Sequence, residues 1–231
     1  DSNAITFLDE HFRSRPELIA FSNRHFYSSR IKVMKERPVS PESMAEQPPA
    51  LILERIEGAR SSTNVNQAEV ERTLELVQAH IHTYQNADTK PNIGILSPFR
   101  AQVDAIRQRL MREISADNIL AFKILVGTPY GFQGEERDLM ILSFTLDNES
   151  RRASYYLNRP DVFNVTVTRA REQQIVLFSG DENTLPPDNL LRLYLESIQS
   201  GYALQQPDAT PHTEFQQQVC NALEIYGISI W

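Results

Sequence analysis

Apolar and polar positions alternate along this chain in blocks that predict strands and helices in turn. Short apolar runs predict strands at 50–56, 92–97, 124–126, 139–144 and 174–179. Apolar side chains at helical spacing predict helices at 17–26, 66–84, 100–114, 161–171 and 190–200. The run at 139–144 is nearly all apolar, which is typical of a central buried strand. The alternation predicts an α/β fold, a mostly parallel sheet with helices on both faces and a helical extension at the carboxyl end.

The expected domain occupies residues 5–200. Before it, Ser2, Asn3 and Ala4 resemble the remnant of a cleaved purification tag, so residues 1–4 are left out of the fold. Within it, the prolines of 38–49 predict a loop, and the polar segment 58–66 predicts a flexible connection. Residues 207–231 read as a linker and an accessory helix over 213–226.

Composition limits the classes of protein to consider. The 231 residues are 41% hydrophobic and 23% charged, which is ordinary for a globular domain, and no apolar run approaches the roughly 18 residues of a membrane span. The only cysteine, Cys220, cannot form an internal disulfide, so a cytoplasmic protein is expected. A net charge of −7 argues against binding nucleic acid by bulk positive charge, although it allows a local basic groove.

Four short motifs interrupt this pattern. They are 11–16 (HFRSRP), 97–102 (SPFRAQ), 128–138 (TPYGFQGEERD) and 164–171 (NVTVTRAR). The third follows an apolar strand and precedes another, which predicts either a ligand-binding loop at the carboxyl edge of the sheet or a surface hairpin.

In this order, the four motifs resemble the second RecA-like domain of superfamily 1 helicases. The nearest branch contains the nonsense-mediated-decay RNA helicases and related replication and repair helicases. The resemblance covers about residues 5–180, and it implies a RecA-like fold and an ATP-dependent helicase or translocase. The branch also implies 5′-to-3′ movement along the strand.

The resemblance assigns two arginines to the nucleotide. Arg13 and Arg169 match the family's arginines that reach across to the nucleotide held by the first domain. A planar, permanently charged guanidinium suits the negative charge that spreads over a transferred phosphoryl group. From the residues alone, both arginines would be assigned to helix surfaces.

Four more residues match nucleotide-side positions. Glu136 matches the acid that hydrogen-bonds the ribose, while Gln133 and Gly134 match the loop that couples nucleotide to nucleic acid. A glycine there permits close approach of the backbone. Phe12 stands where the family usually has tyrosine, so the aromatic face is kept and the hydroxyl is lost.

The same resemblance implies a surface for single-stranded DNA or RNA. The matching positions are Ser97, Pro98, Phe99, Arg100, Thr128 and Tyr130. Hydroxyls and backbone amides bind phosphates, and aromatic rings stack on bases without reading sequence. The alternative for Phe99 is packing in the core.

The sequence contains no G-x-x-x-x-G-K-[ST] motif and no acidic pair suited to Mg²⁺. In the family these lie in the first RecA-like domain, so ATP with Mg²⁺ is expected to be held mainly by that upstream partner. The chain alone is therefore expected to be inactive. No membrane partner is expected.

Two other readings of the domain stay open. It is either a degenerate RecA-like domain that serves as a non-catalytic binding module, or a small-molecule enzyme that uses nucleoside triphosphates. The segment 213–231 also resembles the opening of a nuclease domain of the very-short-patch-repair type, with Glu214 at the position of its first acid. That resemblance and the acidic charge favour DNA over RNA.

Overall fold

The computed structural model describes residues 10–34 and 48–201. Residues 1–4, predicted to be a tag remnant, lie outside these residues, as do most of the proline-rich loop and the segment 207–231 with Glu214. Five strands form one sheet whose neighbouring strands all pair in parallel. In spatial order they are β3 (Leu51–Arg55), β7 (Ala170–Phe178), β6 (Arg137–Ser143), β4 (Ile93–Leu96) and β5 (Leu125–Gly127).

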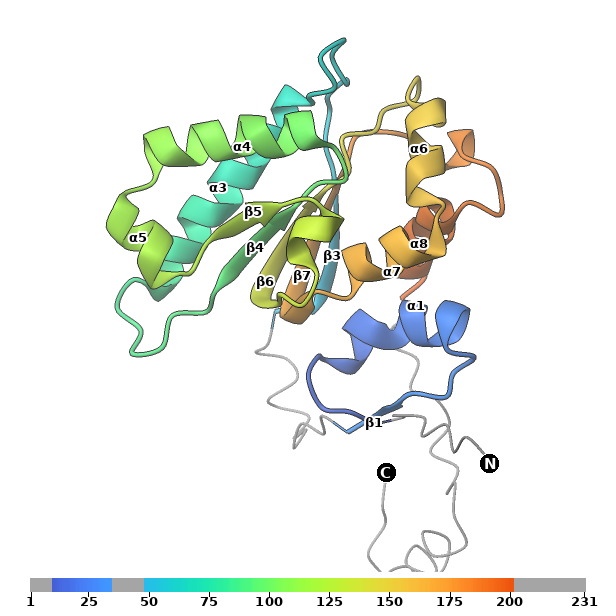
Figure 1. The fold of residues 1–231 in the computed structure, drawn as a ribbon, viewed down its shortest axis with the longest axis horizontal. Helices are drawn as coiled ribbons and strands as arrows, with labels where there is room; N and C mark the ends of the chain where they lie inside the picture. The colour runs from blue at the N-terminus through green and yellow to red at the C-terminus, as the bar shows by residue number, and fades with distance from the viewer. Residues whose placement is uncertain (1–9, 35–47, 202–231) are drawn as a thin grey trace, which may run out of the picture.

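Helices cover both faces of this sheet, as Figure 1 shows. One face carries α3 (Gln67–Tyr84), α4 (Arg100–Glu113) and α5 (Ala116–Ala121). The other side carries α1 (Pro16–Phe26), α6 (Arg151–Leu157), α7 (Pro160–Val167) and α8 (Leu190–Gln199). Outside the sheet, β1 (Glu10–His11) and β2 (Lys32–Val33) form a separate parallel pair. The predicted α/β class, a parallel sheet with helices on both faces, is confirmed.

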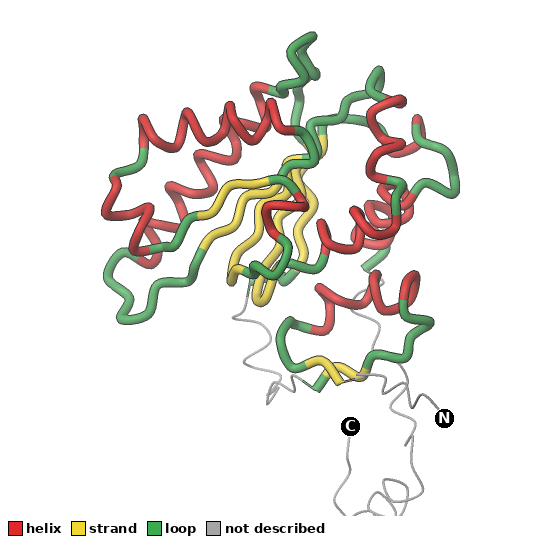
Figure 2. The backbone as a smooth tube through the Cα atoms, in the orientation of Figure 1, coloured by secondary structure: helices red, strands yellow, loops and turns green. Residues whose placement is uncertain are grey.

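The central strand β6 divides the core into two halves. Leu139 and Ile141 pack with the residues of α3 and α4, whereas Met140 and Leu142 pack with those of α1, α7 and α8. Successive side chains of a strand point to opposite faces, so an all-apolar strand needs cover on both sides. The helices seen in Figure 2 on either side of the yellow strands supply it.

The segment between β5 and β6 crosses the sheet instead of forming a hairpin. Both strands pair in parallel with β4, one on each side of it, so the chain must return from the carboxyl edge to the amino edge between them. On the way it forms the short 3₁₀ helix η1 (Pro129–Phe132), whose Phe132 is fully buried. The expectation that the whole loop lies at the carboxyl edge is therefore wrong; only its first residues do.

The helix predicted over 161–171 is too long. It ends at Val167, and β7 begins at Ala170. At the helix end, Thr168 Oγ1 donates to the carbonyl of Asn164 at 2.7 Å, and Arg169 Nε donates to that of Val165 at 2.9 Å. These side chains bind the carbonyl groups that a helix end leaves free.

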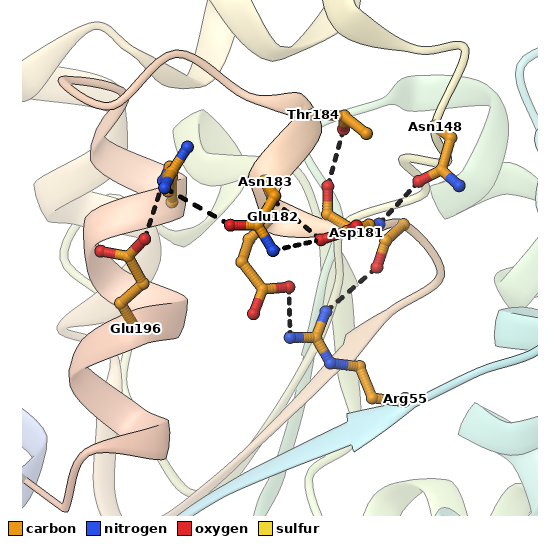
Figure 3. Close-up of polar contacts among 9 residues, drawn as sticks. Arg55, Asn148, Asp181, Glu182, Asn183, Thr184 and Glu196 are labelled. Atoms are coloured by element: carbon orange, nitrogen blue, oxygen red, sulfur yellow. Dashed lines mark hydrogen bonds and ion pairs between the residues drawn. The ribbon is translucent and has the colours of Figure 1, made fainter.

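A polar network fixes the loops beyond the carboxyl ends of β6 and β7 (Figure 3). Arg55, at the end of β3, donates to the carbonyl of Gly180 at 3.0 Å and to the Glu182 carboxylate at 2.5 Å. The amide of Asp181 donates to the side chain of Asn148 at 2.7 Å. This network joins three strand ends, and we assign it a structural role.

The packing of Phe132 generates a prediction about Gly94 on β4. A Cβ atom at Gly94 would lie 2.2 Å from Met140 Sδ and 3.0 Å from the Phe132 ring. We expect Gly94→Ala to lower the free energy of unfolding by about 1–3 kcal/mol, because overpacking a dense core forces side chains and backbone to shift. Urea unfolding followed by circular dichroism measures it.

Gly131→Ala is the matched control. Gly131 lies in η1, and nothing lies within 4 Å of the place where its Cβ would be. Its unfolding free energy is expected to change by less than about 0.5 kcal/mol. Equal effects at the two positions would contradict this account of the core.

Candidate nucleotide and nucleic-acid sites

Backbone hydrogen bonds bring three of the motifs together at the amino-terminal edge of the sheet. The amide of Arg15 donates to the carbonyl of Arg171 at 3.1 Å, and the amide of Arg137 donates to the carbonyl of Arg169 at 3.1 Å. The first bond joins the start of α1 to β7, and the second joins β6 to β7. Residues at these bonds or within two positions before them are thereby held near one another.

Arg13, Glu136 and Arg169 are those residues. The guanidinium of Arg13 forms an ion pair with the Glu136 carboxylate. Burial lowers the pKa of the Arg169 guanidinium, and the nearby charge of Arg13 lowers that pKa further, while Glu136 raises it. The structure thus gathers two cations and one carboxylate, and two guanidinium groups side by side favour an anion between them.

The remaining nucleotide-side residues lie on the surface. Phe12 is 63% exposed, and Gln133 and Gly134 are exposed in the crossing segment. Gly134 has a φ of 83°, and nothing lies within 4 Å of the place where its Cβ would be. Within the described residues, glycine is therefore required by the backbone conformation and not by close packing.

Three of the predicted nucleic-acid-binding residues line one cavity at the carboxyl edge. The cavity has a volume of about 350 Å³ and is lined by Arg60, Asn64, Pro98, Phe99, Arg100, Ala101 and Tyr156. Tyr130, which is 60% exposed, forms a hydrogen bond with Tyr156 and so adjoins this cavity. Burial raises the pKa of Tyr156, and Tyr130 raises it further. The structure thus brings Pro98, Phe99, Arg100 and Tyr130 together.

Ser97 and Thr128 lie close to this edge but face inward in part. The Ser97 side chain is fully buried, where its hydroxyl lies 3.3 Å from Thr145 Oγ1 and accepts a hydrogen bond from the amide of Phe99 at 3.3 Å. Thr128 precedes η1, and its carbonyl accepts from the amide of Phe132 at 3.2 Å. Both residues shape the turns that present their neighbours; their contacts with nucleic acid stay predictions.

A buried carboxylate that the motifs do not contain joins α3 to two strand ends. Glu69 is fully buried and accepts hydrogen bonds from Ser143 Oγ at 2.7 Å, from the amide of Thr145 at 2.9 Å and from Ser179 Oγ at 2.8 Å. The sequence carries one signal for it. Asn66 caps α3 by accepting from the amide of Glu69, and Asn-x-x-Glu is a pattern typical of helix starts.

Gln102 ties the second motif to the same network. Its side-chain oxygen accepts from the amide of Asn66 at 2.9 Å, and its nitrogen donates to Ser143 Oγ at 2.9 Å. The last residue of SPFRAQ therefore anchors the segment that carries Phe99 and Arg100.

Comparisons with known proteins agree with these motifs. A family model described as an AAA domain matches residues 1–181, and the chain belongs to this family. It is 26% identical to Helicase SEN1 of Saccharomyces cerevisiae over 85% of this chain and 9% of that protein. It is 28% identical to RNA helicase Mov10l1 of Homo sapiens over 85% of this chain and 17% of that protein. The chain is thus similar to a small part of much longer helicases, and its motifs are those of a superfamily 1 second RecA-like domain.

One solved structure is also similar. It is the C-terminal domain of a possible DNA helicase from Lactobacillus plantarum WCFS1, with 14% sequence identity and a TM-score of 0.46. The match covers 78% of this chain and 92% of that one.

Two further properties concern only the described ranges, 10–34 and 48–201. None of their helices has the length and apolar character needed to cross a bilayer. They also bring no three His, Cys, Asp or Glu side chains together as a metal-binding group.

The burial of Glu69 predicts a dependence of stability on pH. Burial raises the pKa of Glu69 from 4.5 to about 7, although its hydrogen bonds lower it in part. Between these values the unfolded chain releases the proton first, so the native state binds more protons and the free energy of unfolding falls as pH rises. The loss amounts to about 3 kcal/mol and is complete above the folded pKa.

Glu69→Gln removes this group while keeping its size. Urea unfolding of both proteins at several pH values gives the difference between their unfolding free energies. Between pH 4.5 and about pH 7, we expect the unfolding free energy of the unsubstituted protein to fall relative to that of Glu69→Gln. A difference that does not change with pH would show that Glu69 does not titrate in this way.

Proposed function

We propose that this chain is the second motor domain of an ATP-dependent nucleic-acid helicase or translocase. In this function, the amino edge of its sheet completes a nucleotide site formed mainly by a first RecA-like domain, and the carboxyl edge binds single-stranded DNA or RNA. The observation that carries the proposal is the meeting of Arg13, Glu136 and Arg169 from three distant segments at one edge.

The charges at the amino edge suit a nucleoside triphosphate. Arg169 is held by its bond to the Val165 carbonyl, which fixes the guanidinium without using its charge. Arg13 is partly exposed and lies in the turn before α1, where its guanidinium pairs with Glu136. Together they can stabilise the negative charge that develops on a phosphoryl group during transfer, as ATP with Mg²⁺ is hydrolysed in the adjoining domain.

Glu136 has a second role in the proposed site. A carboxylate accepts hydrogen bonds from paired sugar hydroxyls, so Glu136 suits the ribose. In the present structure it pairs with Arg13. Binding of a nucleotide would replace this internal pair by two contacts to the ligand, one at the phosphate end and one at the sugar.

The carboxyl edge suits a strand bound without sequence preference. Phe99, Tyr130 and Tyr156 provide aromatic faces around the cavity, and Arg100 provides a positive charge at the start of α4. Aromatic stacking combined with positive charge is typical of such binding. We expect the strand to be DNA and not RNA because of the acidic net charge. We expect 5′-to-3′ movement because the resemblance to that helicase branch implies it.

The crossing segment 128–136 couples the two edges in this proposal. It begins beside the cavity at Thr128, is anchored in the core by Phe132 and ends at Glu136. A displacement of one end therefore acts on the other through a single short connection.

The chain by itself is expected not to hydrolyse ATP. Its sequence has no phosphate-binding loop, and both arginines act on a nucleotide held elsewhere. Phosphate release by the purified 231-residue chain, measured at increasing protein concentration, is expected to stay at background with and without single strands. Hydrolysis that rises in proportion to the chain would contradict this.

Arg169→Ala is expected to reduce ATP hydrolysis strongly once the chain is joined to its first RecA-like domain. An arginine that stabilises the transition state contributes about 10³–10⁵-fold in kcat. The assay is steady-state hydrolysis in the presence of single-stranded DNA and, separately, RNA. Arg109→Ala is the matched control, because Arg109 pairs with Glu113 on the outer surface of α4.

The same assay separates the alternatives. If Arg169→Ala leaves hydrolysis unchanged but the chain still binds its partners, the domain is a non-catalytic binding module. If hydrolysis is strong and indifferent to single strands, the protein is a small-molecule enzyme that uses nucleoside triphosphates.

A further inference from the structure

The segment 58–66, expected to be a flexible connection, forms a hydrogen-bonded turn beside the proposed strand site. The amide of Ser61 donates to the carbonyl of Val65 at 2.8 Å, and that of Asn64 donates to the carbonyl of Ser61 at 2.9 Å. The amide of Arg60 donates to the Asp147 carboxylate at 2.7 Å. In Figure 1 the turn projects past the sheet next to the start of α4. Its backbone is therefore held in place by bonds that do not involve the Arg60 side chain.

The side chain of Arg60 lies on the ring of Phe99. The guanidinium carbon is 4.1 Å from the ring centroid, which is within the range of a cation–π contact. The Nε atom is buried, and no hydrogen-bond partner for it exists among the described residues. A flat guanidinium on an aromatic ring offers a surface on which a nucleobase can stack.

Arg60 lines two cavities, and the other charged side chains that line them differ in sign. The first, about 350 Å³, contains Phe99, Arg100 and Tyr156. The second, about 520 Å³, contains Asp147 and Glu149. Phosphates are repelled by the carboxylates of the second cavity and attracted by Arg100 at the first. The first cavity also falls in the ~300–1,000 Å³ range of small-ligand sites, so it can hold a base.

We propose that Arg60 is a further nucleic-acid-binding residue, whose guanidinium forms with Phe99 a platform on which one base of the single strand stacks inside the first cavity. The proposal rests on the proposed function, because it adds a residue to the strand site at the carboxyl edge. Arg60 belongs to none of the four motifs, and only its position over Phe99 identifies it.

Variants of Arg60 distinguish a stacking contact from a charge contact. Arg60→Ala removes both the flat group and the charge, whereas Arg60→Lys keeps the charge and loses the flat group. Both variants keep the amide that bonds to Asp147. Arg109→Ala changes the charge equally at a surface pair away from the cavity. Arg100→Ala tests the strand site itself.

The measurement is the anisotropy of labelled single-stranded DNA and RNA oligonucleotides titrated with the 231-residue chain at several salt concentrations. Thermal unfolding of each variant establishes that it is folded. We expect Arg60→Ala and Arg60→Lys each to weaken binding roughly tenfold, as the loss of one stacked base does. The salt dependence of binding is expected to stay unchanged, and Arg109→Ala is expected to bind like the unsubstituted chain.

Other results overturn the proposal in distinguishable ways. Full binding by Arg60→Lys, with a salt slope reduced by about 1 for Arg60→Ala, would show a phosphate contact and no stacking. Unchanged binding by both Arg60 variants, with weak binding by Arg100→Ala, would remove Arg60 from the site and leave the proposed function intact. Failure of the unsubstituted chain to bind either oligonucleotide would overturn the proposed strand site together with this inference.

Discussion

The parallel pairing of β4 with both β5 and β6 is the constraint on which the arrangement of the sites depends. Two strands that run in the same direction on either side of a third cannot be joined by a tight turn. The chain between them has to travel the full height of the sheet. Because this connection is short, it has no room for a long helix and carries instead one 3₁₀ turn with a buried Phe132.

This constraint explains why one motif has two ends with different chemistry. Thr128 and Tyr130 belong to the edge where strands finish, and Glu136 belongs to the edge where they begin. Gly94 leaves room for the Phe132 ring between these ends, so the middle of the connection is fixed in the core. The backbone bonds from Arg15 and Arg137 then bring the first and fourth motifs to Glu136.

Much of the fold could be predicted because the apolar pattern was regular. All five main strands and the helices α1, α3, α4 and α8 lie where the pattern placed them, and no end differs by more than four residues. The strand predicted at 174–179 begins four residues later than β7 does, because Arg171, Glu172 and Gln173 give no apolar signal. The helices α5 and α6 are six and seven residues long and too short to show helical periodicity.

Only site residues that belong to the four motifs could be predicted from the sequence. The resemblance named Arg13, Glu136 and Arg169, and the structure places them together. The burial of Glu69 could not be predicted, because its partners Ser143 and Ser179 are 74 and 110 residues away along the chain. A charged residue in an amphipathic helix is ordinarily assigned to solvent, and only the tertiary structure shows donors around it. Arg60 lies in a turn, and its contact with the Phe99 ring is likewise visible only in the tertiary structure.

The ion pair between Arg13 and Glu136 has a consequence for how selective an isolated domain of this kind is. This pair neutralises Arg13 while no ligand is bound, so Arg169 is the one cation of the three groups whose charge is left to attract a free anion. In the proposed function, Arg13 becomes available to a phosphate when the same ligand also offers hydroxyl groups to Glu136. Under the proposed function, such a surface favours a molecule that carries a sugar and a phosphate chain together over inorganic phosphate.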